Sequence, residues 1–463
     1  MKINWGARTL SFARLMEPLD RSLARMSASQ PDDAAVRRLR WFWLDGLLAT
    51  ISGSFYGSFV VLFAVAYGAS NAQVGQLIAI GSLAGLIALL PGAQAIKLLG
   101  GRRKAVVLLF GGGIARVALL AWIALPFLIR GPGLATPEAA GRAIVIIIAV
   151  NAVMSFAGNF ANPAWTAIVA DIVPRDIRGR FFSHRNVAAN LPALLIVPLA
   201  GWLIQIGNRP AAPFAGYQIV FALAFVSGAF STLFYSKITD PAPLSQVRQR
   251  QSLAELVRII RSAPGFLSLV AVTLLWNLGS QMTGPFLNVY LVSNLGATTA
   301  LVGWTTAASS LAALLTQRWM GRWVDRRGNI WVQGALSFIL PGIPLAWMVA
   351  TAPWHVLIIN AIAGILWTGH GLASFNLLLD LAPEQARAEA NALFQLVVAG
   401  SAVIAPMVSG YLIDAFGFQP MFALSAAVRV LGALAFLWWV ARPMARNPIS
   451  GVRTQCHTHP NPK

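Results

Sequence analysis

Carboxylate and guanidinium groups gather in short turns between the long apolar segments of this sequence. Asp325 and Arg326 lie in one such turn, flanked by Gly321 and Gly328. Gly, Asp and Arg are ordinary turn residues, and a carboxylate can cap a helix N-terminus or pair with arginine. The chemistry expected here is therefore a reversible electrostatic contact. Simple anchoring of a tight, solvated turn is the alternative.

Two further Asp–Arg combinations have the same character. Asp171 is followed by Arg178, and Asp380 is followed by Arg387, in each case at the end of an apolar segment. We predict similar electrostatic contacts at both places.

Three ionisable residues fall well inside apolar segments, where charge is costly, whereas Asp45 and Asp414 lie near the ends of theirs. His370 titrates near neutral pH and is a candidate for binding a coupling proton; a buried neutral histidine bonded to a backbone carbonyl is the other interpretation. Arg116 and Arg429 are interpreted as structural partners of buried carbonyls or carboxylates, with binding of a substrate anion as the alternative.

Sequence signatures of covalent chemistry are missing. We find no Walker sequence, no H-E-x-x-H and no G-x-S-x-G, so we expect neither a fused ATPase nor a conventional intramembrane hydrolase. Cys456 is the single cysteine, with His457 and His459 beside it, whereas structural metal sites require four ligands. We therefore expect no enzyme activity, no metal site and no cofactor.

The composition indicates that the bilayer is the solvent. The 463 residues are 57% hydrophobic and 11% charged, with a mean hydropathy of +0.67. A helix of about 20 residues crosses the roughly 30 Å of hydrocarbon. We predict twelve transmembrane helices, at 41–67, 72–96, 105–129, 143–170, 181–206, 217–238, 264–291, 298–320, 329–350, 354–381, 390–416 and 420–440.

The net charge of +20 is distributed as membrane insertion requires. With both termini cytoplasmic, 30 of the 35 Lys and Arg fall on the cytoplasmic side, and only Arg130, Arg142 and Arg209 fall opposite. Binding to nucleic acid is therefore not needed to explain the charge. Because there is no N-x-S/T acceptor and the loops are short, the bacterial cytoplasmic membrane is the expected location.

An internal repeat divides the chain into two halves. Residues of the second predicted span recur in the eighth, and those of the fourth and fifth recur in the tenth and eleventh. The matches include Gly75 with Gly303, Ser82 with Ser310, Asp171 with Asp380, Arg178 with Arg387 and Gly201 with Gly410. Because equivalent spans are six apart, an even number of crossings, the two copies have the same orientation in the membrane. The predicted domains are a basic cytoplasmic segment 1–40, six-helix bundles 41–238 and 263–440, a cytoplasmic linker 239–262 and a cytoplasmic tail 441–463.

The pattern G-x-x-x-D-R-x-G from Gly321 to Gly328 resembles the loop signature of the major facilitator superfamily of membrane transporters. This resemblance implies an all-α integral membrane protein with two parallel six-helix pseudo-repeats. It also implies that Asp325 gates the cytoplasmic side, with the start of the fifth span around Arg178, Arg180 or Arg185 as its target. The sequence departs from the family at Ile96, which replaces the motif aspartate in the first half.

In the family fold, spans 1, 4, 7 and 10 line a central cavity, and polar groups in hydrocarbon should face the bundle interior. For each residue alone, pairing of helices through polar groups is an equally good explanation. Amides and aromatic rings with little charge suit a neutral or amphipathic organic solute. The candidate cavity residues are Tyr56, Asn159, Asn162, Trp276, Asn277, Gln281, Trp367 and His370.

The resemblance implies a secondary active transporter that moves a small-molecule substrate by rocker-switch alternating access. Its partners would be the lipid bilayer and protons or another coupling ion. Two alternatives stay open. One is a membrane sensor or assembly factor that keeps the fold without transporting, which the degraded turn at Ile96 favours. The other is a lipid flippase, because Trp- and Phe-rich spans could admit a lipid tail.

Overall fold

The computed structural model describes residues 12–26, 33–98, 101–129, 136–173, 177–239, 258–259 and 263–446. Within these ranges the chain is helical apart from turns and one isolated bridge, between Arg209 and Ala212. Eleven of the described helical segments are long and apolar enough to cross a membrane. The helix at the predicted fifth span has a shorter apolar stretch, Leu191–Gly207. The all-helical membrane fold is confirmed, while the twelfth crossing stays a prediction.

The first half contains the helices that precede the linker, and its third span includes a π-helical stretch of eight residues. The helices are α1 (Phe12–Met26), α2 (Asp33–Tyr56), α3 (Val60–Ala66), α4 (Asn71–Leu98), α5 (Arg103–Val106), η1 (Val107–Ile114), α6 (Ala115–Leu128), α7 (Pro137–Ile172), α8 (Arg178–Gly207) and α9 (Ala215–Ser236).

The second half follows the predicted linker 239–262, most of which lies outside the described residues. Its helices are α11 (Pro264–Thr283), η3 (Gly284–Phe286), α12 (Leu287–Ser293), α13 (Thr299–Arg327), α14 (Asn329–Ile339), α15 (Gly342–Met348), α16 (Pro353–Leu381), η4 (Glu384–Ala386), α17 (Arg387–Phe416), α18 (Phe418–Phe436), η5 (Leu437–Ala441) and α19 (Arg442–Arg446).

The first spans of the two halves are broken at equivalent places. α2 ends at Tyr56 and α3 begins at Val60, while the 3-10 turn η3 separates α11 from α12. Pro285 lies in that turn, as its lack of a backbone N–H favours. Broken helices beside a pseudo-symmetry axis are typical of transporters with internal repeats.

The N-terminal basic segment contains a helix that packs on the first half. Leu23 of α1 is fully buried and lies in one cluster with Phe42 of α2 and Phe181 of α8. Arg40 donates a hydrogen bond of 2.8 Å to Asp20, which fixes α1 against the start of α2. α2 itself begins at Asp33, so the first membrane helix starts earlier than the predicted 41.

The two halves meet through two equivalent helix crossings, α4 with α17 and α8 with α13. A Cβ placed on Gly75 would lie 2.4 Å from the Pro406 carbonyl oxygen, and one on Gly303 would lie 2.5 Å from the Cα of Pro198. Glycine is therefore required where these backbones touch.

The same crossings contain a second pair of glycines. A Cβ on Gly201 would lie 2.2 Å from the carbonyl oxygen of Thr299, and one on Gly410 would lie 2.3 Å from that of Asn71. Gly75, Gly201, Gly303 and Gly410, which the sequence repeat matches in pairs, thus lie where backbones of the two halves touch.

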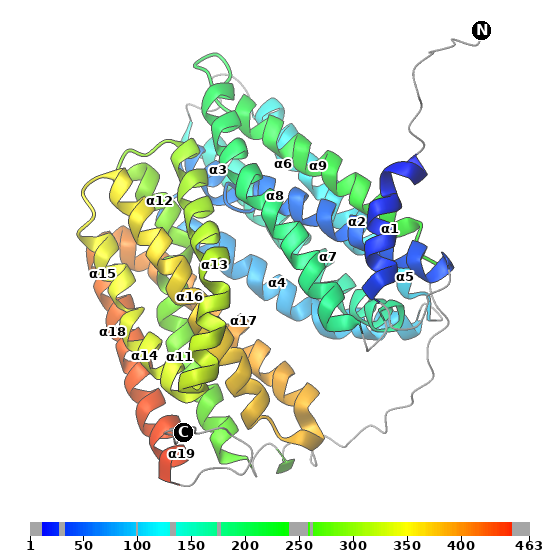
Figure 1. The fold of residues 1–463 in the computed structure, drawn as a ribbon. Helices are drawn as coiled ribbons and strands as arrows, with labels where there is room; N and C mark the ends of the chain where they lie inside the picture. Colours follow the sequence, from blue (N-terminus) through cyan, green and yellow to red (C-terminus); the bar gives the residue numbers. More distant parts are fainter. Residues whose placement is uncertain are drawn as a thin grey trace.

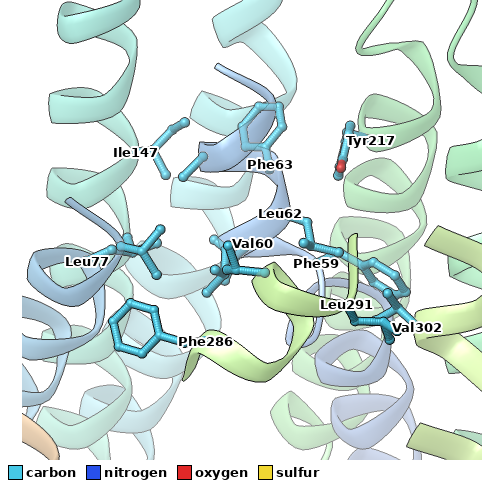
Figure 2. Packing of buried hydrophobic residues seen from close by; sticks show 14 of the residues in the cluster. Phe59, Val60, Leu62, Phe63, Leu77, Ile147, Tyr217, Phe286, Leu291 and Val302 are labelled. Carbon is cyan, nitrogen blue, oxygen red and sulfur yellow. The ribbon is translucent and has the colours of Figure 1, made fainter. Parts of the chain in front are cut away.

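Apolar packing joins the halves on the same side of the molecule. Figure 2 shows Phe286, Leu291 and Val302 of the second half in one cluster with Phe59 and Val60 of the first. We call this side, which contains α3 and α12, the closed side; the ends that bear the linker form the linker side. From the closed side the halves diverge toward the C-terminal end of α7 and the N-terminal end of α17 (Figure 1).

Candidate functional site

A cavity of about 490 Å³ lies between the halves. Most of its wall comes from α4 and α7, with α17 of the second half closing one side. None of its lining residues carries a formal charge. They are Tyr56, Gly57, Val60, Ile78, Gly81, Ser82, Gly85, Leu86, Leu89, Asn151, Ser155, Asn159, Ala399 and Ala402.

Glycines of α4 make room for two amides of α7 in this cavity. A Cβ on Gly81 would lie 2.4 Å from the Nδ2 of Asn151, and one on Gly85 would lie 2.6 Å from that of Asn159. Asn151 donates to the carbonyl oxygen of Leu77 at 3.0 Å, and Asn159 donates to that of Ser155 at 2.9 Å. Both amide orientations are fixed, and no hydrogen bond to either Oδ1 is found in the described structure. Each can therefore accept one from a solute.

Tyr56 supplies the aromatic part of the wall at the last residue of α2. Its ring lies 6.1 Å from that of the buried Trp122 in α6, which supports it from behind. Two of the predicted cavity residues, Tyr56 and Asn159, are thus brought together.

Asn162 lines a different cavity, although it follows Asn159 by less than one helical turn. That cavity, of about 210 Å³, lies inside the first half, between α2, η1, α7 and α9. It also contains Asp45 and Arg116.

Trp276, Trp367 and His370 form an aromatic cluster inside the second half. His370 is buried and stacks on Trp276 with ring centroids 4.2 Å apart, while Trp367 meets Trp276 edge-on at 5.3 Å. The Nε2 of His370 lies 2.9 Å from the Nε2 of Gln333 in α14. His370 is therefore buried, but its partner is a side-chain amide and not a backbone carbonyl.

The buried Arg429 of α18 borders this cluster. It donates to the Oγ1 of Thr283 at 2.6 Å and to the carbonyl oxygen of Ser280 at 3.4 Å, and its guanidinium lies 6.0 Å from the Trp276 ring. These contacts agree with a structural partner of buried polar groups in α11.

Two other predicted cavity residues lie on α11. Asn277 donates to the carbonyl oxygen of Thr273 at 2.9 Å, a bond within its own helix. Asn277 and Gln281 are both partly buried.

The motif residues of the second half lie in the C-terminal two turns of α13 and at its C-cap, on the linker side. Gly328 caps that helix with φ of +84°, a conformation that side chains disfavour, while Gly321 has open space around it. Asp325 and Arg326 are exposed, and no partner of Asp325 is found among the described residues. Only the backbones of the expected targets Arg178 and Arg180 belong to the described structure.

Arg185, the third expected target of Asp325, is held inside the first half. Its guanidinium lies 4.6 Å from the Phe42 ring and 5.8 Å from the Trp165 ring.

Asp171 and Asp380 make equivalent contacts that sequence reasoning did not find. Asp171 accepts from Arg103 at 2.6 Å, and Asp380 accepts from Asn329 at 2.8 Å. In each half the donor closely follows a positive-φ glycine at the turn between the second and third span of that half. The aspartate and the glycine turn recur in both halves of the sequence, and this recurrence could have predicted the two contacts. Arg387 is exposed at the start of α17, and the predicted pairs Asp171–Arg178 and Asp380–Arg387 stay predictions.

Asp414 forms the main polar contact between the halves on the closed side. Its carboxylate accepts from the backbone N–H groups of Asn71 and Ala72, at 3.0 and 2.8 Å, and from the Asn71 side chain at 2.9 Å. A carboxylate of α17 thus caps the N-terminus of α4.

Comparison with known proteins agrees with this architecture. The sequence profile described as Major Facilitator Superfamily matches residues 42–283 and 269–455. The chain is 25% identical over 193 residues to a "Putative sugar efflux transporter" of Deinococcus radiodurans, covering 40% of this chain and 48% of that protein. It is 25% identical over 292 residues to "Multidrug resistance protein MdtG" of Citrobacter koseri, covering 62% of this chain and 69% of that protein.

Solved structures share the fold at low identity. An inward-facing, occupied bacterial homologue of the human lysosomal transporter Spinster superposes with a TM-score of 0.66 at 14% identity, covering 88% of this chain and 97% of that chain. An inward-facing bacterial homologue of the iron transporter ferroportin superposes with a TM-score of 0.66 at 18% identity, covering 87% of this chain and 98% of that chain. A mutant form of the nucleoside transporter NupG superposes with a TM-score of 0.65 at 14% identity, covering 86% of this chain and 99% of that chain.

Proposed function

Because the chain belongs to the major facilitator superfamily, we propose that it is a secondary active transporter of a small neutral or amphipathic organic solute. The proposal also includes insertion in a bacterial cytoplasmic membrane with both termini cytoplasmic. The linker side is then the cytoplasmic side, and the basic residues in its loops support that orientation.

The observation that carries the proposal is the uncharged lining of the cavity between the halves. Its volume of about 490 Å³ falls within the ~300–1,000 Å³ of small-molecule sites. Asn151 and Asn159 offer amide acceptors, and Tyr56 offers a ring and a hydroxyl. A carboxylate or phosphate would have no counter-charge there, so a neutral solute fits better. The relatives named for sugar efflux and multidrug resistance support an organic solute.

Rocker-switch alternating access is the proposed mechanism. The halves meet on the closed side and diverge toward the linker side (Figure 1), which corresponds to a state open to the cytoplasm. In the opposite state the linker side closes, and Asp325 then meets the start of α8. The exposed position of Asp325 supports this role, because a gating carboxylate is unpaired when its gate is open.

Proton coupling is a separate part of the proposal. His370 remains the proposed coupling group, and its contacts with Gln333 and Trp276 would rearrange on protonation. Uptake with and without an imposed pH gradient tests this part independently of the solute.

Solute flux into proteoliposomes tests the transporter against a sensor or assembly factor. A screen of neutral metabolites and drugs by thermal shift identifies the solute to label. We expect Asn159→Ala and Asn277→Ala to raise KM, and Asp325→Asn to lower the rate with little change in binding. Unchanged flux in all three variants would show that the assignments of the cavity and of the gate are wrong. The absence of flux of any bound solute would favour the sensor.

A further inference from the structure

The cavity of about 210 Å³ inside the first half differs in chemistry from the one between the halves. A buried carboxylate and a guanidinium both line it, from α2 and α6. We propose that it binds a small zwitterion of the α-amino-acid type, with the ammonium group at Asp45 and the carboxylate at Arg116. This inference goes beyond the proposed function and does not depend on the cavity between the halves.

Asp45 is the central group of the site. Its side chain is buried, with 8% exposed, and it is the one buried carboxylate found in the described parts of the chain. The hydroxyl of Ser231 in α9 donates to its Oδ1 at 2.7 Å. No ion pair of Asp45 is found in the described structure, so its charge is compensated only at longer range. A buried charge in that condition is costly unless a ligand satisfies it.

Arg116 provides the opposite charge on the same cavity. Its Nη1 donates to the hydroxyl of Ser52 at 3.1 Å, and its buried Nε has no hydrogen-bond partner in the described structure. Asp45 and Arg116 thus line one cavity, and no ion pair between them is found in the described structure. A ligand with an ammonium and a carboxylate would satisfy both groups and recover part of the cost of burying them.

Arg185 explains why a zwitterion fits better than a simple cation. Its guanidinium covers Gly46, next to Asp45 in sequence, and interacts electrostatically with the Asp45 carboxylate. Arg116 and Arg185 together give the surroundings of Asp45 a net positive charge. A bare divalent cation would add to this positive charge, whereas a zwitterion adds no net charge and places its carboxylate beside a guanidinium.

The space in the cavity comes from glycines. Gly111 and Gly112 lie in the π-helix η1, whose wide turn faces the cavity, and π-helical segments occur frequently at functional sites. Gly158 of α7 also lines the cavity, and a Cβ there would meet no atom within 4 Å. The volume lies below the ~300–1,000 Å³ of drug-sized pockets, so the ligand must be small.

Binding of the proteinogenic L-α-amino acids to the purified full-length protein in detergent tests the proposal. A thermal-shift screen finds the best amino acid, and equilibrium binding of its labelled form follows. We expect Asp45→Asn and Arg116→Gln each to weaken binding by about tenfold or more. The N-acetyl and the carboxamide derivatives should each fail to compete. An N-acetyl derivative that competes as well as the parent would overturn the assignment of the ammonium group to Asp45. A carboxamide derivative that does so would overturn the assignment of the carboxylate to Arg116.

A space-filling variant covers the case in which the charge variants fail to fold. Gly158→Val should abolish binding because its side chain enters the cavity. Gly141→Val is the matched control, since Gly141 lies on the same helix, also has open space around it, and does not line the cavity. Equal binding by the two variants would contradict the proposal.

Further outcomes separate this inference from the proposed function. Loss of amino-acid binding in Asn159→Ala but not in Gly158→Val would place the ligand between the halves and overturn the inference alone. A thermal shift with Mn²⁺ that Asp45→Asn removes, without any amino-acid response, would also overturn it. Amino-acid binding that depends on Asp45, in a protein without flux, would instead support the inference and contradict the proposed function.

Discussion

At the scale of single residues, one carboxylate near a helix end joins the two halves. Asp414 belongs to α17 but satisfies the N-terminal N–H groups of α4. Such groups have no partner within their own helix, and a negative charge beside them is favourable by about 0.3–1 kcal/mol. The contact therefore belongs to the closed side and must break when that side opens.

Replacement of Asp414 is expected to open the closed side. Asp414→Ala removes a cap worth about 0.5–2 kcal/mol, and Asp414→Asn should have a smaller effect because it keeps an acceptor. The measurement is the rate at which a cysteine at the buried Ala72 is alkylated, in a Cys456→Ser background without other cysteines. Glu138→Ala, at the exposed start of α7, is the control. Equal rates for all variants would show that Asp414 does not hold this contact.

A second residue-scale prediction concerns the turn after α13. Gly328 has φ of +84° and ψ of 153°, a region almost restricted to glycine, so Gly328→Ala should cost about 1–3 kcal/mol. Gly321→Ala, in the open helical part of the same motif, should be neutral or stabilising by up to about 1 kcal/mol. Thermal unfolding of the two purified variants compares them. A more stable Gly328→Ala protein would contradict the strain argument.

At the scale of helices, the crossings between the halves depend on glycine. Gly410→Val should destabilise the closed arrangement strongly, because its Cβ would meet the backbone of Asn71. Gly400→Val is the matched control in α17, with no atom within 4 Å of its Cβ. We expect a lower unfolding temperature for Gly410→Val alone, measured in the same detergent. Similar unfolding temperatures would indicate that the crossing has room to adjust.

The same crossings show how much the sequence could predict. The repeat identified Gly75, Gly201, Gly303 and Gly410 as equivalent residues, and the structure places all four where helices of the two halves touch. Repeated small residues mark close helix contacts because only they allow backbones to approach. The all-helical fold and its two halves followed from span length and the repeat.

The rotation of each helix about its axis was not predictable. Asn159 and Asn162 were both assigned to one cavity, yet they line two different ones. A membrane helix is apolar toward lipid as well as toward its neighbours, so its apolar pattern does not fix which face points inward. The partner of His370 was not predicted either, since Gln333 comes from the ninth span, which is not among the spans expected to line the cavity.

At the scale of the whole molecule, the proposed rocker-switch mechanism requires the halves to separate on the closed side. Gln76 of α4 donates to the hydroxyl of Tyr411 in α17 at 2.8 Å, across the interface. Cysteines at these two positions, joined by a reducible bismaleimide in the Cys456→Ser background, should stop flux, and reduction should restore it. The control pair replaces Gln218 and Ile123, which contact each other within the first half. Full flux in the cross-linked Gln76–Tyr411 protein would exclude movement at this interface.

The two crossings are equivalent in backbone but differ in the hydrogen bonds found across them. Asp414 joins α17 to α4 through three hydrogen bonds, whereas α8 has Gln205 at the matching position. Among the described residues, α8 accepts one hydrogen bond from α13, from Thr299 to the carbonyl oxygen of Gly201. We therefore expect the α8–α13 crossing to separate first. The α4–α17 crossing, held by Asp414, would act as the pivot until it separates as well. In the proposed mechanism and orientation, the closed side would open first along the α8–α13 edge, and the solute would meet an asymmetric intermediate before both crossings separate.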